Sequence, residues 1–240
     1  MTHHSEIESA FDQYAEEYEA ALGQGLSVTG ENKDYFAEGR VRWLKECLEE
    51  LLEQPRAAMD YGCGTGATSP LFRNIIGSES VVGVDTSPKL LERARQRYGS
   101  ERSQFFLIDQ YQPAEKIDLA FCSGVFHHIP YQDRAAAALY IHRSLRPGGV
   151  FAFWENNPWN PATRYVMSRI PFDRDAITLT PPEARQLLQD GGFEVLRTDF
   201  LFVFPRMLKW LRWIEPKISW LPFGGQYQIL CRKPVHEKAL

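Results

Sequence analysis

The sequence predicts an α/β fold in which a mostly parallel sheet is covered by helices on both faces. Two short runs, 81–85 and 105–109, are nearly continuous in apolar residues and end in an acid, which is typical of strands buried on both faces. A third run, 57–61, leads into three glycines at every second position, so a tight turn is expected after it. Amphipathic stretches that suit helices lie between the runs.

Composition supports one domain over residues 1–240. Hydrophobic residues make up 44% of the chain and charged residues 24%, enough for a full core. The net charge is −4, and no basic block is interleaved with aromatic residues, so nucleic acid is not a favoured partner. Scattered cysteines, no signal peptide and no apolar run of transmembrane length favour a cytoplasmic protein. The oligomeric state cannot be inferred.

The other elements follow from periodicity and stop signals. Trp43, Leu44 and Leu48 recur on one side of a helix predicted over 35–53. The helix predicted over 133–145 stops at the Arg-Pro-Gly-Gly run 146–149, as expected from glycine and proline. Further helices are predicted from the glycine turn to about 76, over 90–98 and over 180–191, and strands over 57–61, 81–85, 105–109, 117–122, 150–154, 193–204 and 226–232.

The glycine turn carries the first sign of a ligand. Gly62, Gly64 and Ala67 satisfy the dinucleotide pattern Gly-x-Gly-x-x-Gly/Ala. Asp60 would repel a pyrophosphate but suits a ligand with an ammonium group. The whole run, Asp-x-Gly-x-Gly-x-Gly from Asp60 to Gly66, resembles the first motif of the class I S-adenosylmethionine-dependent methyltransferases.

This resemblance implies a Rossmann-like, seven-stranded, mostly parallel sheet whose last strand is antiparallel. It covers about 60–154, where the elements match in order, and the Leu-Arg-Pro-Gly-Gly run before the fifth strand is among its specific signals. It divides the chain into an N-terminal helical lid or cap (1–53), a cofactor-binding core (54–154) and two acceptor-side insertions (155–179 and 204–225). The implied cofactor is S-adenosyl-L-methionine, with S-adenosyl-L-homocysteine as product.

Asp85 is the candidate for binding the ribose. It lies 19 residues beyond Gly66, and an acid about 20 residues past such a turn can accept both ribose hydroxyls. The alternative, a helix cap, is less favoured because Ser87 and Pro88 already supply that chemistry. The resemblance also includes Cys63 and Thr86 among the cofactor residues, and it implies Asp109 at the adenine amino group, Gln110 beside the ring, and Ser123, Gly124 and His127 beneath the sulfonium.

The N-terminal segment has two interpretations. Ile7, Phe11, Tyr14, Tyr18 and Leu22 form one face of an amphipathic helix. The helix could simply cover apolar surface. The run Phe-Asp-x-x-Ala-x-x-Tyr is also similar to the lid that closes over the cofactor in small-molecule methyltransferases, and Tyr14 and Tyr18 would then contact it.

Acceptor contacts are expected beyond the fifth strand, because loops at the carboxyl ends of strands carry recognition. The loop 155–165 is rich in amide and aromatic side chains, and Glu155, Asn156, Trp159 and Arg164 are its candidates. Arg164 and its neighbouring arginines could pair with an anionic acceptor or remain solvated surface charges.

The second insertion contains three tryptophans. If Pro205 starts a helix, Met207, Leu208, Trp210, Leu211 and Ile214 share one face, opposite basic residues. Such a helix can lie in a membrane interface, which predicts peripheral membrane contact through 205–221. The favoured alternative is that this face packs on the sheet or, with Trp210 as a substrate contact, roofs the acceptor pocket.

The expected activity is methyl transfer to a small-molecule acceptor through an oxygen, nitrogen or carbon nucleophile, including an apolar or lipid-linked metabolite. His128 or Glu155 could take a proton from a hydroxyl acceptor. No metal site is expected, because no carboxylate or cysteine accompanies the histidine pair 127–128 at ligand spacing. The alternatives are a non-catalytic cofactor-binding regulator and a nicotinamide-dependent oxidoreductase, which Asp60 and Gly66 both argue against.

Overall fold

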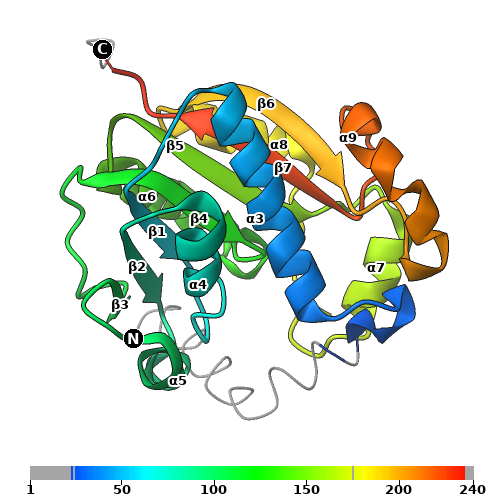
Figure 1. The fold of residues 1–240 in the computed structure, drawn as a ribbon, viewed down its shortest axis with the longest axis horizontal. Helices are drawn as coiled ribbons and strands as arrows, with labels where there is room; N and C mark the ends of the chain where they lie inside the picture. The colour runs from blue at the N-terminus through cyan, green and yellow to red at the C-terminus, as the bar shows by residue number, and fades with distance from the viewer. Residues whose placement is uncertain (1–22, 24, 175, 236–240) are drawn as a thin grey trace.

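A seven-stranded sheet forms the centre of the protein. The computed structural model describes residues 23, 25–174 and 176–235. The strand order is β3-β2-β1-β4-β5-β7-β6, as Figure 1 shows. The strands are β1 Ala57–Tyr61, β2 Ser80–Asp85, β3 Ser103–Leu107, β4 Ile117–Ser123, β5 Leu145–Asn156, β6 Glu194–Leu201 and β7 Gln226–Arg232.

Strand directions agree with the predicted sheet. The pairs β1·β2, β1·β4, β2·β3 and β4·β5 are parallel, whereas β7 runs antiparallel to both β5 and β6. Five strands have bounds that differ from those expected: β2 and β4 by one residue, and β3, β5 and β6 by more, with β6 ending at Leu201 rather than at residue 204. β3 ends at Leu107 rather than at residue 109, and β5 starts at Leu145, five residues early, with an irregular register against β4 between Ile117 and Leu119.

Helices cover both faces of the sheet. The first face carries α3 (Lys33–Glu50), α4 (Ser69–Leu71) and the π-helical turn η2 (Phe72–Ile76), and the second carries α6 (Arg134–Ser144) and α8 (Pro181–Asp190). The remaining elements are α5 (Pro88–Tyr98), α7 (Pro161–Ser168), α9 (Glu215–Ile218) and the short helices η1 (Ser27–Thr29), η3 (Phe126–His128), η4 (Tyr131–Asp133) and η5 (Arg206–Ile214).

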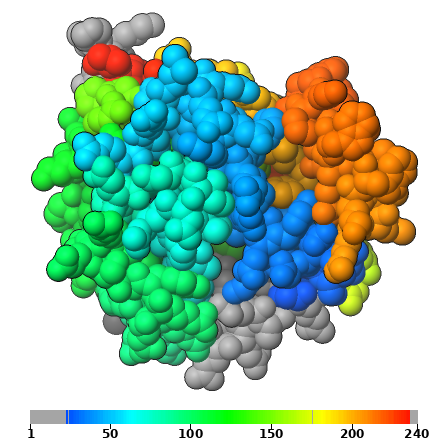
Figure 2. All heavy atoms as spheres, in the orientation of Figure 1, coloured from blue at the N-terminus to red at the C-terminus, as the bar shows by residue number. Residues whose placement is uncertain are grey.

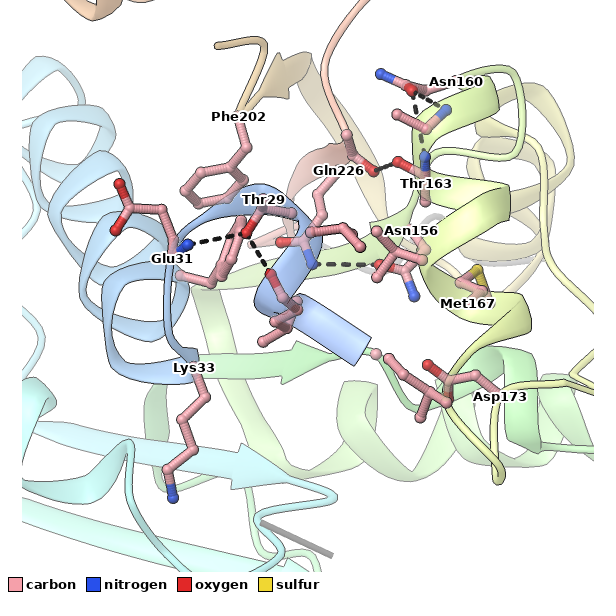
Figure 3. A pocket seen from close by; sticks show the side chains of 18 of the residues that line it. Thr29, Glu31, Lys33, Asn156, Asn160, Thr163, Met167, Asp173, Phe202 and Gln226 are labelled. Atoms are coloured by element: carbon pink, nitrogen blue, oxygen red, sulfur yellow. Dashed lines mark hydrogen bonds between the residues drawn. The ribbon is translucent and has the colours of Figure 1, made fainter. Parts of the chain in front are cut away.

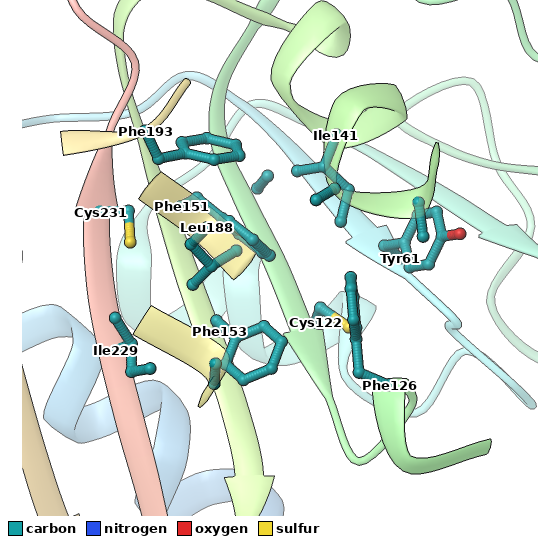
Figure 4. Packing of buried hydrophobic residues seen from close by; sticks show 14 of the residues in the cluster. Tyr61, Cys122, Phe126, Ile141, Phe151, Phe153, Leu188, Phe193, Ile229 and Cys231 are labelled. Carbon is teal, nitrogen blue, oxygen red and sulfur yellow. The ribbon is translucent and has the colours of Figure 1, made fainter. Parts of the chain in front are cut away.

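The core has one large apolar cluster on each face. Figure 4 shows the second face, where Ile141 of α6 and Leu188 of α8 pack near Phe151 and Phe153 of β5. On the other face, the predicted side of α3 is buried, including Trp43, Leu44 and Leu48. Because both faces are covered, the central strands can be apolar throughout, as the sequence predicted.

Two insertions differ locally from the prediction. The segment after β5 was expected to be a loop, but Pro161–Ser168 forms α7, whose N-cap Asn160 accepts hydrogen bonds from the N–H groups of Ala162 and Thr163. The helix expected after Pro205 is the 3₁₀ helix η5, interrupted at Leu208, and α9 follows it. Figure 2 shows this segment projecting from the body of the molecule. Among the described helices, none is long and apolar enough to cross a membrane.

Candidate active site at the carboxyl ends of the strands

The glycine turn after β1 uses its three glycines in different ways. All three have positive φ, between 53° and 75°. A Cβ on Gly62 would lie 2.3 Å from the Val125 side chain, and one on Gly66 would lie 2.9 Å from the Phe105 ring. At Gly64, by contrast, a Cβ would meet nothing within 4 Å. Gly62 and Gly66 therefore allow close packing, whereas Gly64 faces open space.

Asp60 lies at the end of β1, beneath this turn, and is only 3% exposed. Its Oδ2 atom has no hydrogen-bond partner among the described residues. Burial, followed by the nearby Asp85 carboxylate, raises the pKa of Asp60 to about 7, while the Arg40 guanidinium opposes the shift. A buried carboxylate oxygen without a partner fits a ligand that supplies a hydrogen-bond donor.

Asp85 connects the glycine turn to the next helix. Its Oδ2 accepts a hydrogen bond from the N–H of Gly64 at 2.8 Å, and its Oδ1 accepts one from the N–H of Ser87 at 2.9 Å. The predicted cap is also present, because the Ser87 hydroxyl accepts from the N–H of Leu90. A carboxylate oxygen can accept more than one hydrogen bond, so the chemistry of Asp85 suits contact with a ligand hydroxyl.

A cavity of about 740 Å³ opens beside this turn, and we name it the glycine-turn cavity. Its wall contains seven of the predicted cofactor residues: Gly62, Gly64, Asp85, Thr86, Asp109, Ser123 and Gly124. His128, expected as a proton acceptor, lines it as well. Asp60, Cys63 and Gly66 lie outside the lining, and Gln110 is an exposed turn residue that does not reach it. Ile108, Tyr111 and Tyr140 line it without having been predicted.

A second cavity, of about 510 Å³, lies between α3 and α7 and is named the α7 cavity. Figure 3 shows Asn156 and Gln226 at its centre, where the Gln226 Nε2 donates to the Asn156 Oδ1 at 3.2 Å. Arg40 donates to the Gln226 Oε1 at 3.0 Å, so three polar side chains are linked there. Apolar side chains form much of the remaining wall, among them Phe36, Val166, Met167, Ile170, Phe172 and Phe202.

The two cavities meet at the turn after β4. Ser123, Gly124 and His128 line both of them. The position of this turn follows from the sheet, because β4 lies between β1 and β5 and its carboxyl end is at the switch in strand order. A molecule in one cavity can therefore approach a molecule in the other at these three residues.

A buried network of ionisable groups lies behind this junction. The Oε2 of Glu155 is 2.5 Å from the Nδ1 of His127, and its Oε1 accepts the N–H of Phe126 at 2.8 Å. On the other side, the Oδ1 of Asp173 lies 3.5 Å from the Nε2 of His127 and 3.2 Å from the Nε2 of His128. Glu155 is 2% exposed and lines neither cavity, so among the predicted proton acceptors only His128 borders both.

The network separates the protonation states of the two histidines. Burial alone would lower the pKa of His127, but the Glu155 and Asp173 carboxylates outweigh it and raise that pKa to about 10. Burial and the neighbouring His127 lower the pKa of His128. Burial would raise the pKa of Asp173, but the adjacent rings of His127 and His128 lower it to about 2. At neutral pH, His127 is therefore charged and His128 is neutral.

The sequence showed no carboxylate at ligand spacing from the two histidines. In the fold, Asp173 lies beside them, although it is 45 residues beyond His128 in the chain. The N–H of Ile177 donates to the carbonyl of His127 at 3.0 Å, which holds this segment against η3. The possible ligand atoms of His127, His128 and Asp173 lie within 4.8 Å of one another. The argument against a metal site, that the histidine pair lacks a carboxylate partner, therefore does not hold in the fold. Only the tertiary structure could bring these residues together.

The residues predicted to contact the acceptor do not all line a cavity. Asn156 lines the α7 cavity, but Trp159, Arg164 and Trp210 line neither cavity. Arg164 is exposed, and Trp159 stacks on Phe200 with ring centroids 6.3 Å apart. His127, expected beneath the cofactor, lines the α7 cavity instead. Tyr14 and Tyr18 lie outside the described residues.

Sequence reasoning missed Arg40 and Gln226, which come from α3 and the start of β7. No local motif marks either position, because their proximity depends on the packing of α3 over the sheet. The start of α7 was detectable, since Asn160 followed by Pro161 is an N-cap followed by a favoured first helical residue.

The chain is similar in sequence to known methyltransferases over part of its length. A trans-aconitate 2-methyltransferase from Methylobacterium radiotolerans is 37% identical over 120 residues, which cover 49% of this chain and 45% of that protein. One from Azoarcus sp. is 30% identical over 137 residues, with coverage of 57% and 53%. The chain therefore spans about half the length of the curated relatives it matches.

Solved structures share the fold over most of the chain. An S-adenosylmethionine-dependent methyltransferase from Thermotoga maritima has a TM-score of 0.63 at 20% identity, covering 95% of this chain and 99% of that one. One from Mesorhizobium loti has a TM-score of 0.59 at 20% identity, covering 82% and 99%. Residues 59–153, which contain the glycine turn and the cavity junction, match the methyltransferase domain family. Residues 59–153 therefore resemble a methyltransferase domain, and the chain as a whole shares the fold of the S-adenosylmethionine-dependent methyltransferases.

Proposed function

We propose that this protein transfers a methyl group from S-adenosylmethionine to a small-molecule acceptor that has a largely apolar body. One observation carries the proposal: the two cavities share Ser123, Gly124 and His128, so donor and acceptor can meet there. When bound, the cofactor supplies a methyl group activated by a positive sulfur. The main task of the chain is then to align the acceptor, and positioning of this kind can contribute roughly 7–11 kcal/mol.

In this proposal the cofactor occupies the glycine-turn cavity. The partnerless Oδ2 of Asp60 and the open space at Gly64 support binding of the methionine portion near the turn. Asp85 and Asp109 line the same cavity, in keeping with roles at the ribose and at the adenine amino group. Ser123 and Gly124 would lie next to the reacting methyl group.

The acceptor is assigned to the α7 cavity. Its apolar wall favours a ligand body without charge, whereas the linked Asn156, Gln226 and Arg40 favour one polar or anionic group. Burying an isolated charge in an apolar site is unfavourable, so this group should contact the polar side chains. The exposed segment 205–221 borders the cavity and is the part of the chain for which we propose peripheral membrane contact.

His128 is the proposed proton acceptor for a hydroxyl nucleophile. Its lowered pKa keeps it neutral, and Asp173 at 3.2 Å from Nε2 favours a proton on that nitrogen, so the basic lone pair of the neutral ring is on Nδ1. A general base adds about 10²–10⁴-fold to the rate. Glu155 is better suited to a positioning role, because it binds His127 and the N–H of Phe126.

A carboxylate acceptor is the second candidate. It is favoured by Arg40 in the wall of the cavity and by relatives named trans-aconitate 2-methyltransferase. A carboxylate needs no base, so replacing His128 distinguishes the two chemistries. With a hydroxyl acceptor, H128A should lower kcat by about 10²-fold or more without loss of cofactor binding. Unchanged turnover in H128A would remove the base assignment.

The test of the function is formation of S-adenosylhomocysteine by the purified full chain. Candidate acceptors should include apolar phenols, lipid-linked alcohols and carboxylic acids. Binding of S-adenosylmethionine by calorimetry without turnover of any acceptor would favour a cofactor-binding regulator. Binding of NAD in its place would favour an oxidoreductase and contradict the proposal. A parallel assay after chelator treatment and dialysis should give the same rate if the histidine network works without a metal.

A further inference from the structure

Residues 205–223, named here the aromatic lobe, expose apolar side chains to an unusual degree. Met207, Trp210, Trp213, Trp220 and Phe223 are between 60% and 82% exposed. By contrast, the tryptophans at 43 and 154 are buried in the core. The sequence left open whether this segment packs on the sheet, and the structure leaves its tryptophans outside.

Polar groups of the aromatic lobe face the protein instead. The buried Glu215 carboxylate accepts hydrogen bonds from the N–H groups of Phe202 at 3.2 Å and Phe204 at 2.9 Å. Arg212 forms an ion pair with Glu31 at 2.9 Å and stacks over the Tyr35 ring at 4.5 Å. The usual amphipathic arrangement is therefore inverted, since polar side chains anchor the lobe and aromatic ones point outward.

Charges on the lobe surface have one sign. Arg206, Lys209 and Lys217 are exposed, and the acid of this segment, Glu215, is buried. Lys217 also lies over the ring of Trp213, with its Nζ 5.2 Å from the centroid. Exposed tryptophans combined with cations suit the boundary between lipid headgroups and acyl chains, where the rings are partly buried and the cations meet anionic lipid.

The aromatic lobe is also continuous with the α7 cavity. Phe204, Pro205 and Arg212 line that cavity, while Trp210 and Trp213 lie on the outside of the same segment. The surface of the lobe thus lies next to the wall of the cavity, so a molecule in the outer part of a membrane would be brought close to the cavity. Figure 2 shows the lobe projecting beyond the neighbouring surface, so a flat surface could reach it.

We propose that the aromatic lobe docks the protein peripherally on an anionic phospholipid bilayer, with Trp210, Trp213 and Trp220 at the headgroup level. The positive charge of the lobe selects anionic over zwitterionic lipid. Because no helix among the described residues could cross a membrane, the contact is interfacial. This inference concerns where the protein works and does not depend on which acceptor it methylates.

The experiment is sedimentation of the full chain with phosphatidylcholine vesicles, with and without phosphatidylglycerol. Wild type should partition onto the anionic vesicles about tenfold more than onto the neutral ones, and raised salt should release it. Tryptophan fluorescence should shift to the blue on binding. W210S/W213S should lose this partition by about tenfold, and K209E/K217E should lose the preference for anionic lipid.

The matched control is Y131S, which removes an exposed aromatic residue from η4, outside the lobe, and should partition like wild type. Cofactor-induced thermal stabilisation should be equal in all variants, which verifies that they fold. Failure of wild type to bind anionic vesicles, or equal binding by W210S/W213S, would overturn the proposal. A dimer by light scattering that W210S/W213S converts to monomer, without vesicle binding, would show that the lobe meets a second copy instead.

Discussion

Asp60 has an environment that favours ligand binding over the stability of the free protein. The folded-state pKa of about 7 lies above the ordinary value of 3.8. A carboxyl group with a raised pKa contributes most to stability below pH 3.8, and that contribution is lost as pH rises through 7. A cationic donor at Oδ2 would offset the cost of ionising this buried group.

The first prediction concerns D60N. In wild type, affinity for S-adenosylmethionine should rise as pH increases from 6 to 8, because Asp60 ionises and attracts the ammonium group. D60N should remove this rise, weaken binding by about tenfold or more, and stabilise the free protein at pH 8 by about 1–3 kcal/mol. Calorimetric titrations across this range, with urea unfolding, measure both effects. An equal pH slope in D60N would assign the titration to another group.

The second prediction compares two glycines of one turn. Both have positive φ, so G64A and G66A share a strain of about 1–2 kcal/mol. In G66A the new Cβ would also lie 2.9 Å from Phe105 and 3.0 Å from Ala94, so we expect about 2–4 kcal/mol of destabilisation in all. In G64A the Cβ would enter the space assigned to the cofactor, and the loss should fall mainly on affinity.

Urea unfolding and calorimetric titration of the two variants, side by side, test that comparison. Greater loss of affinity in G66A than in G64A, at equal stability, would contradict the assignment of the open space at Gly64 to the cofactor.

At the scale of elements, η3 and β5 are joined through Glu155. This residue extends from β5 and binds both the backbone N–H of Phe126 and the His127 ring of η3. The turn that separates the two cavities is therefore held by a charged contact inside the protein. Removing one partner of a buried ion pair leaves the other uncompensated, which is strongly unfavourable.

The third prediction concerns E155Q. In wild type, His127 contributes stability that is fully present below pH 6.5 and is lost as pH rises through about 10, because its folded-state pKa is raised. E155Q should lower the free energy of unfolding by about 3 kcal/mol at pH 7 and reduce its fall between pH 7 and 10. Denaturant unfolding at several pH values measures this.

Glu79 supplies the control for that prediction, because it pairs with Arg56 on the surface, where both side chains are largely exposed. E79Q should change stability by less than about 1 kcal/mol. A similar loss in the two variants would show that burial of the Glu155 pair has no special effect.

For the whole molecule, the two cavities should be separable by mutation. Val166 lines the α7 cavity from α7 and is distant in sequence from the glycine turn. The fourth prediction is that V166F fills this cavity, lowers methyl transfer by about tenfold or more, and leaves cofactor affinity within about twofold. S168F places the same aromatic ring at an exposed position on the same helix and should do neither. Loss of cofactor affinity in V166F would mean that one ligand occupies both cavities.

The elements of the core were predictable because their signals are local. Apolar runs, glycine turns and helix stops gave all seven strands, and the bounds of β7 agree with the structure. The lining of the glycine-turn cavity follows the same rule, since Gly64, Asp85 and Asp109 lie at or just beyond the ends of β1, β2 and β3, which share one edge of a parallel sheet. Prediction was weaker after β5, where Trp159 and Arg164 were expected at the acceptor but line neither cavity.

The sequence by itself determined the sheet, the glycine turn and the acids near it, because each depends on neighbours within a few residues or on strand order. Only the tertiary structure decided that Asp173 meets the two histidines, that Arg40 and Gln226 enter the second cavity, and that the lobe tryptophans face outward. The physical reason is that these contacts join segments far apart in the chain. Their side chains are compatible with several surroundings, and packing selects one.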